Sequence, residues 1–399
     1  MPIQLAGTKL AIAAMSLDKP SETFIRDHIR MIAPGETIIL CQNSRGSEQF
    51  GYPVLCDVGG GWQLGNSLVA RYSNAVRRYW RRNLHPELSS QERRRVRTFF
   101  ETHLPRAVLA EYGVMGCALV QVCEDASVPF YVHFHGYDAS KLLRRARWRR
   151  RYAKLFRSAA GIIAPSRFLA DNLRAAGCPE SKLHVSPCGV DPLRFTPARR
   201  NGAQRLLAVG RLVEKKAPHL TIAAFGRIAA RFPEATLDIV GDGPEAARCR
   251  ALINPLGLEG RVHMHGSRTP DFVARLMQEC SIFVQHSITS SNGDTEGLPV
   301  AILEAMASEM AVVATRHSGI PEAVEDGVTG LLVVEHDVEA MALAIANLLD
   351  DPARAAAMGI AGRKRVLQNF TLERSRDRLR AIMGFAPLAA IPLATAEAS

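Results

Sequence analysis

The sequence predicts an α/β protein built from two doubly wound domains. Its 399 residues are enough for two domains of nearly 200 residues each. Short apolar runs that end in glycine recur, such as residues 237–240 before Gly241 and residues 262–265 before Gly266. Runs of this kind are typical of buried parallel strands, and ligands bind at the carboxyl edge of such sheets.

The first half of the chain alternates between apolar runs and helical patterns. We expect strands at residues 9–14, 37–41, 54–58, 128–133, 161–166 and 183–188. A helix should begin near Phe24, where the hydroxyl of Ser21 or Thr23 could cap it. Another should begin at Ser166, and the region from 68 to 100 is expected to be helical and basic.

Pro192 and Pro197 predict an extended connector between the two domains, because proline disfavours helix in the residue before it. We therefore expect an N-terminal domain at residues 1–195 and a second domain at residues 196–375. Strands are expected in the second domain at residues 205–209, 237–240, 262–265, 283–285 and 310–315. Its helices should span residues 300–308, 338–349 and 352–368, followed by a last helix at 372–383 and a frayed tail.

The stretch from Ser287 to Pro321 has the pattern of an anion site. A polar loop leads into Gly297-Leu298-Pro299, and proline is well tolerated in the first turn of a helix. Free backbone N–H groups at such a helix start favour a phosphate. Two carboxylates flank this point, Glu296 before the helix and Glu304 two turns later. Together they suit an elongated ligand with a phosphate centre and hydroxyl groups on both sides, such as a sugar nucleotide.

The run from Glu296 to Glu304, EGLPVAILE, resembles the E-x7-E signature of the family-4 retaining glycosyltransferases, which have the GT-B fold. Residues 319–322, GIPE, followed by residues 326–332, are similar to the segment that follows the signature in that family. The resemblance is strong over about residues 205–335. It implies two Rossmann-like domains, with the acceptor bound by the first and the nucleotide sugar bound by the second. It also implies a last helix, within residues 376–399, that crosses back to the first domain.

The resemblance assigns roles to individual residues of the second domain. It implies that Glu304 binds the ribose hydroxyls, that Glu296 contacts the donor sugar, and that Gly297 and Leu298 line the donor site. Arg211 and Lys216 match the basic pair that holds the diphosphate, with Lys215 as the alternative lysine because Ala217 replaces the usual glycine. Basic side chains between a strand and a helix can neutralise a leaving diphosphate. No Asp-x-Asp pair is present, so we expect no bridging metal and no cofactor.

The stretch HFHGYD at residues 133–138 is similar to an H-x-H-G-x-D stretch in related enzymes. That likeness points to His135 facing the reacting sugar and to Asp138 as an acceptor contact. Residues 21–24 resemble an SETF stretch of exopolysaccharide enzymes, which makes Ser21 and Thr23 candidate acceptor ligands. His133 and His135 could bind a metal, but no third ligand is evident from the sequence.

Basic residues are concentrated in the first half, where 30 Lys and Arg face 16 Asp and Glu, whereas the second half is slightly acidic. Arginines stand beside Trp and Tyr at residues 77–82 and 144–151, with a further arginine cluster at 93–97. This pattern suits an anionic membrane surface, and also nucleic-acid phosphates. We favour the membrane because the sequence carries no RNA-binding signature. The eight cysteines show no CxxC pair, which favours reduced thiols and a cytoplasmic location.

These features predict a metal-independent retaining hexosyltransferase at the inner face of the cell membrane. The donor would be a UDP- or GDP-sugar, and the acceptor a saccharide on a polyprenyl diphosphate in extracellular polysaccharide synthesis. No nucleic-acid partner is expected. The alternatives are a sugar-nucleotide epimerase of the same fold and a non-enzymatic polyanion-binding or nucleic-acid-binding protein. No run of 18 apolar residues exists, so we expect no membrane span.

Overall fold

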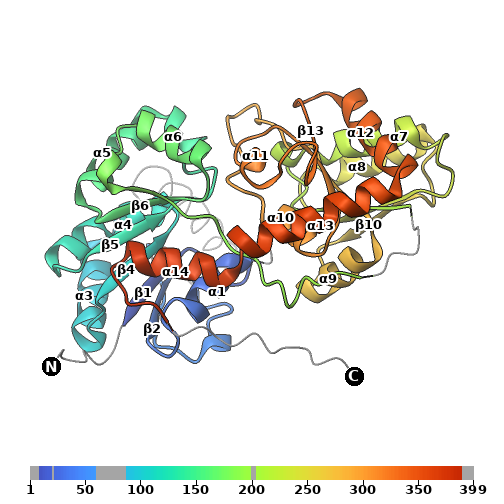
Figure 1. Cartoon of the computed structure of the whole chain (residues 1–399). Coiled ribbons are helices and arrows are strands. Elements are labelled where there is room, and N and C mark those ends of the chain that lie inside the picture. The colour runs from blue at the N-terminus through green and yellow to red at the C-terminus, as the bar shows by residue number, and fades with distance from the viewer. Residues whose placement is uncertain (1–8, 20–21, 60–86, 199–203, 389–399) are drawn as a thin grey trace, which may run out of the picture.

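The computed structural model of the chain describes residues 9–19, 22–59, 87–198 and 204–388. They form two α/β domains that lie side by side (Figure 1). The predicted α/β class with two doubly wound domains is confirmed. The division of the chain near residues 195 and 375 stays a prediction.

The first domain has a parallel sheet in the order β3-β2-β1-β4-β5-β6-β7. Its strands are β1 (Leu10–Ala14), β2 (Thr37–Cys41), β3 (Val54–Leu55), β4 (Ala107–Glu111), β5 (Phe130–His133), β6 (Gly161–Ala164) and β7 (Leu183–Val185). Every residue of β1, β2 and β4 is buried, as expected for parallel strands covered on both faces. The helices are α1 (Thr23–Met31), α3 (Ser90–His103), α4 (Gly113–Asp125), α5 (Ala146–Ser158) and α6 (Arg167–Ala175).

The second domain repeats this plan with the strand order β10-β9-β8-β11-β12-β13. Its strands are β8 (Arg205–Val209), β9 (Thr236–Val240), β10 (Val262–Gly266), β11 (Ile282–Gln285), β12 (Ala311–Thr315) and β13 (Gly330–Val333). The helices are α7 (Pro218–Ile228), α8 (Ala246–Ile253), α9 (Pro270–Glu279), α10 (Val300–Ala307), α11 (Ile320–Ala323), α12 (Val338–Asp350) and α13 (Pro352–Asn369).

The chain returns to the first domain at its end. Helix α13 packs on the second domain, and α14 (Leu372–Ile382) lies against α1 of the first (Figure 1). Leu379, Met383 and Phe385 join the hydrophobic core of the first domain. The backbone of Leu372 donates to the carbonyl of Val190 at 3.0 Å, just after β7. The last helix therefore ties the two domains together at the connector.

Two local expectations differ from the structure. Helix α1 begins at Thr23 with Glu22 at its N-cap and no side-chain cap, while Ser21 lies outside the described residues. The strand expected at 54–58 is only two residues long. The arginines at 77–82 lie outside the described residues. In the described part of the expected helical region, α3 begins at Ser90 with a capping box formed by Ser89 and Glu92.

The aromatic residues of the second arginine cluster point into the core. Helix α5 is amphipathic, and Trp148 and Tyr152 are at most 1% exposed. Arg149 and Arg150 are exposed beside them. A helical repeat of 3.6 residues puts every third or fourth residue on the buried face, which explains the interleaving of arginine and aromatics. The prediction that Trp148 meets a membrane surface is wrong; only the arginine face of α5 remains available.

Within the described ranges, no helix is both long enough and apolar enough to cross a bilayer.

Candidate active site

A cleft of about 460 Å³ lies between the two domains. Its walls include the loops that follow β1 and β4 in the first sheet and β8 and β11 in the second. In each sheet the strand order reverses between these two strands, and this is where open α/β sheets bind ligands. The cleft is lined by the following residues predicted from the sequence: Thr23, His135, Arg211, Lys216, Glu296, Gly297, Leu298 and Glu304.

Glu296 and Lys216 form the central ion pair of the second domain's wall. Lys216 Nζ lies 3.3 Å from Glu296 Oε1, and both side chains are largely buried. Burial alone would raise the pKa of Glu296, but the nearby ammonium groups of Lys216 and Lys215 outweigh it and lower the pKa to about 2. Burial lowers the pKa of Lys216, although Glu296 opposes that shift. Glu296 is therefore a fixed carboxylate at neutral pH.

The two lysines have different surroundings. Lys215 Nζ donates to Asp294 Oδ1 at 3.0 Å and to the Thr295 carbonyl at 2.9 Å, so it holds the loop before Glu296. Lys216 extends toward Gly210 and the cleft, where its Cε lies 3.2 Å from where a Gly210 Cβ would be. This arrangement favours Lys216 as the diphosphate ligand and gives Lys215 a supporting role.

Glycines bring two strand ends close together beside Arg211, which is exposed at the cleft. Gly210 and Gly241 follow β8 and β9 and have φ values of 155° and 144°. A Cβ on Gly241 would lie only 1.9 Å from the Gly210 carbonyl oxygen, so no larger residue fits there. Because neither glycine has a side chain, the backbone at Gly210 and Gly241 is open to the cleft, and a phosphate could lie against it near Arg211.

Helix α10 presents its start and one carboxylate to the cleft. Gly297, Leu298 and Pro299 precede its first residue, Val300, so the positive end of the helix faces the cavity. Glu304 lies farther along the same helix, and burial raises its pKa to about 7, with Arg194 opposing the shift. Glu296 and Glu304 therefore differ in charge near neutral pH, which the sequence pattern did not indicate.

His135 stands on the opposite wall and is held by a buried carboxylate that the sequence analysis missed. Glu111, at the end of β4, is fully buried; its Oε2 lies 2.7 Å from His135 Nε2 and its Oε1 lies 2.7 Å from His28 Nδ1. Burial would raise the pKa of Glu111, but His28 and His135 hold it far below its usual range. The signal available in the sequence was an apolar strand, residues 107–110, that ends in Glu111 two residues before Gly113.

The other predicted acceptor residues are placed differently. Thr23 lines the cleft at the start of α1, together with Glu22, whose carboxylate accepts from the Tyr112 hydroxyl at 3.0 Å. Asp138 is fully buried and does not line the cleft; it accepts from the backbone N–H groups of Gly113, His135 and Gly136 at 2.8–3.1 Å. This placement disfavours an acceptor contact, because the carboxylate is used to hold the loop that carries His135.

Two further residues after β12 support the site from behind. The backbone N–H of Glu296 donates to His317 Nε2 at 3.1 Å, and Glu335 binds the other ring nitrogen of His317. Glu322 reaches across to the first domain and accepts from the backbone N–H groups of Arg167 and Phe168, at the start of α6. The sequence had shown GIPE only as a family-like segment, whereas the structure gives its glutamate a partner.

Comparisons with known proteins match both domains. The family model described as Glycosyltransferase Family 4 matches residues 35–194, and the one described as Glycosyl transferases group 1 matches residues 190–365. A protein of Salmonella typhimurium named as a colanic acid biosynthesis glycosyltransferase, WcaL, is 38% identical over 217 residues, which is 54% of this chain and 53% of that protein. A GDP-mannose-dependent phosphatidylinositol monomannoside mannosyltransferase of Mycolicibacterium smegmatis is 35% identical over 55% of this chain and 60% of its own length.

The chain thus spans little more than half the length of these curated relatives. Among solved structures, Anabaena Alr3699/HepE in complex with UDP superposes with a TM-score of 0.76 at 19% identity, covering 94% of this chain and 99% of that one. These comparisons support neither the epimerase nor the nucleic-acid-binding alternative. Because the two family models together reach from residue 35 to residue 365, and the fold agrees, the chain belongs to the family-4 glycosyltransferases and has the GT-B fold.

Proposed function

We propose that this protein is a retaining hexosyltransferase that moves a sugar from a nucleotide diphosphate to a saccharide acceptor in extracellular polysaccharide synthesis. The observation that carries the proposal is the interdomain cleft, which brings Arg211, Lys216, Glu296 and Glu304 to one wall and His135 to the other. The relatives named for colanic acid synthesis and for mannosyl transfer support the same class of reaction.

The donor is proposed to lie along the second domain. Glu304 binds the ribose hydroxyls, Arg211 and Lys216 hold the diphosphate, and Glu296 binds the donor sugar. As the bond between sugar and phosphate breaks, negative charge grows on the phosphate oxygens. Cations that are already in place stabilise that charge more than they stabilise the ground state, which lowers the barrier. In this scheme no divalent metal has to bridge the diphosphate.

The acceptor is proposed to enter from the first domain, near Thr23 and His135. A polyprenyl-diphosphate-linked saccharide would place the enzyme at the inner face of the membrane. Exposed arginines of α5 and α3 support this location, because each cation near an anionic surface contributes on the order of 1 kcal/mol. They include Arg94, Arg95, Arg97, Arg149 and Arg150.

The function is tested by unfolding the protein thermally in the presence of a panel of UDP- and GDP-sugars. A ligand at about 100 times its dissociation constant adds roughly 2.7 kcal/mol to the state that binds it, which should raise the melting temperature by several degrees. A shift with one nucleotide class, lost in Glu304→Ala, supports the donor site and names the base. No shift with any nucleotide sugar would overturn the proposal.

A further inference from the structure

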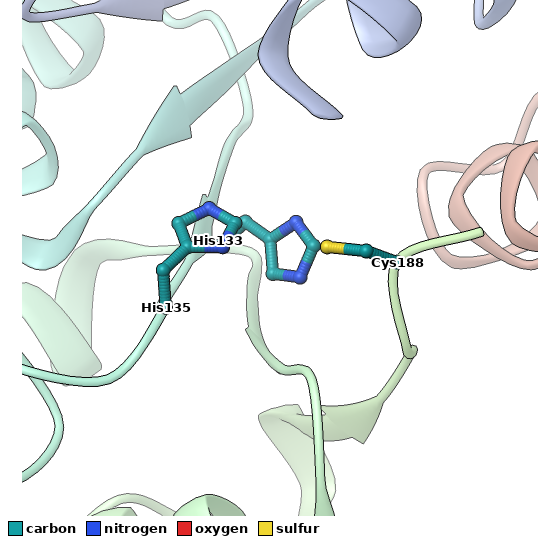
Figure 2. A group of neighbouring side chains, drawn as sticks. All are labelled: His133, His135 and Cys188. Atoms are coloured by element: carbon teal, nitrogen blue, oxygen red, sulfur yellow. The ribbon is translucent and has the colours of Figure 1, made fainter. Parts of the chain in front are cut away.

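Three side chains of the first domain, each with a metal-binding atom, converge beside the interdomain cleft. They are His133 and His135 from the end of β5 and Cys188 from the loop after β7, and Figure 2 shows them together. Their candidate ligand atoms all lie within 4.8 Å of one another. The sequence places Cys188 more than 50 residues from the histidines, which is why the H-x-H pair lacked a visible third ligand.

A second, independent observation concerns the surroundings of His133. Its side chain is fully buried, yet neither ring nitrogen has a hydrogen-bond partner. Glu111 Oε2 lies 3.9 Å from Nδ1, which is beyond hydrogen-bond distance, and the backbone of Ser186 also lies near the ring. A buried polar group that is left unpaired destabilises the folded protein, so a ligand that pairs with an imidazole nitrogen would remove that cost.

The surroundings already contain the support that metal-binding histidines have. Glu111 Oε2 lies 2.7 Å from His135 Nε2 and so holds this imidazole in place. A carboxylate behind a ligating imidazole fixes its tautomer and orientation and raises its basicity. His28, Glu111 and His133 form a second, overlapping group of ligand-type atoms within the same 4.8 Å limit.

We propose that His133, His135 and Cys188 bind one zinc-class divalent ion. Two imidazoles and one thiolate are ligands that zinc takes in proteins. Zinc bonds of about 2.0–2.3 Å put the ligand atoms of a tetrahedron roughly 3.5 Å apart, so binding requires these side chains to move closer together. On binding, the Cys188 S–H bond breaks, a sulfur–metal bond forms, and the proton leaves to solvent.

The site would face the acceptor side of the cleft. His135 and Cys188 line the cavity, whereas His133 is fully buried and does not line it. Three protein ligands leave the fourth position of a tetrahedral ion for a water or a substrate hydroxyl oxygen. The ion is therefore distinct from one that would bridge the donor diphosphate, and the inference does not depend on the proposed transfer reaction.

The proposal is tested on the full chain by measuring its metal content and by recording its absorption spectrum with Co²⁺ bound. Protein purified without chelator is assayed by inductively coupled plasma mass spectrometry, and chelator-treated protein is then titrated with Zn²⁺ and with Co²⁺. We expect one zinc per chain and, with Co²⁺, a thiolate-to-metal charge-transfer band in the near ultraviolet. Absence of that band in folded wild-type protein would overturn the proposal, whatever the enzyme's activity.

Variants locate the ion. Cys188→Ser should remove the charge-transfer band, and His133→Gln should abolish stoichiometric binding. Glu111→Gln should weaken Zn²⁺ by roughly 10- to 100-fold by releasing His135. Cys178→Ser is the matched control, because Cys178 is a buried thiol of the same domain outside the cluster, and it should bind as the wild type does. Circular dichroism checks that each variant folds. If folded Cys188→Ser and His133→Gln bind Zn²⁺ as well as the wild type does, the ion is adventitious only and the assignment is wrong.

Discussion

At the scale of single residues, the ion pair between Glu296 and Lys216 is the contact on which the proposed donor chemistry depends most. Glu296→Gln removes a carboxylate whose pKa is held at about 2 and leaves Lys216 without its partner. Losing one hydrogen bond from a charged group costs about 1.5–3 kcal/mol, so kcat/KM should fall roughly 10- to 150-fold. Steady-state kinetics with the matched nucleotide sugar measures this.

The control for Glu296→Gln is Glu234→Gln, an exposed glutamate of the same domain. It should retain wild-type kinetics. Wild-type turnover in Glu296→Gln would contradict the assignment.

Glu304 gives a pH prediction. Burial raises its pKa to about 7, so the free protein carries a protonated Glu304 below that pH. If the carboxylate accepts from ribose hydroxyls, affinity for a nucleotide sugar should weaken as pH falls below about 7, by up to tenfold per unit, and level off above it. Isothermal titration calorimetry from pH 5.5 to 8.5 measures the profile. A nucleotide sugar suits the experiment because its diphosphate does not titrate in that range.

The stability contribution of Glu304 has the opposite sign from that of a salt-bridged acid. Its folded pKa lies above the ordinary value, so the folded state holds more protons between pH 4.5 and about 7. Folding stability from this group therefore falls as pH rises through that window. Glu304→Gln should flatten both the binding profile and this part of the stability profile, and an unchanged binding profile in the variant would argue against the ribose contact.

At the scale of secondary-structure elements, α5 shows why arginine-rich helices mislead a membrane interpretation. Trp148 is 1% exposed and packs with Tyr152, whose ring centroid lies 5.6 Å away. Trp148→Ala should lower the free energy of unfolding of the first domain by about 3–5 kcal/mol, because a large cavity replaces the ring. Urea unfolding followed by circular dichroism tests it.

Arg150→Ala is the comparison for Trp148→Ala, since Arg150 is exposed two residues away on the same helix. Its effect on unfolding should stay within about 0.5 kcal/mol. The core assignment would fail if Trp148→Ala unfolded like the wild type and lost only its affinity for vesicles.

At the scale of the whole molecule, Glu322 links the two domains. Its carboxylate accepts the first backbone N–H groups of α6 in the other domain, at 2.9 and 3.1 Å. Removing a helix cap typically costs 0.5–2 kcal/mol. Glu322→Ala should therefore favour a more open arrangement, with a larger radius of gyration by small-angle X-ray scattering. Glu325→Ala is the control, because the Glu325 carboxylate lies 3.6 Å from Arg365 of the same domain, and this variant should leave the radius of gyration unchanged. An equal change in both variants would speak against the link.

The proposed binding to an anionic membrane depends on how charge is distributed over the whole surface of the molecule. Replacing Arg149 and Arg150 by Glu should weaken binding to anionic vesicles by about 2 kcal/mol or more, roughly thirtyfold, at low salt. Binding of the wild type should fall as salt rises, because exposed charges are screened. Co-sedimentation with anionic and neutral vesicles measures both effects. Arg248→Glu with Arg250→Glu, exposed on α8 of the second domain, is the matched control, and an equal loss in both double variants would contradict a first-domain membrane face.

The sequence by itself determined the α/β architecture and most strands, because buried parallel strands leave short apolar runs that need no partner to be recognised. It also indicated Arg211, Lys216, Glu296 and Glu304 as candidates, because they flank predicted strands and helices and match the motifs of the family that the sequence resembles. Residues 107–125 escaped notice, although they form β4 and α4 and carry Glu111. Their pattern is mostly apolar, which distinguishes poorly between strand and helix.

Only the tertiary structure decided which side chains share a neighbourhood. The pairing of Glu111 with His28 and His135 spans 83 and 24 residues of sequence, and Cys188 reaches His133 only because β7 lies two strands from β5. The tertiary structure likewise shows that Trp148 is buried, unlike the neighbouring arginines, and that Asp138 is buried and does not line the cleft. Secondary structure follows from local periodicity, whereas proximity, burial and charge coupling arise from strand order and domain packing, which residue spacing does not encode.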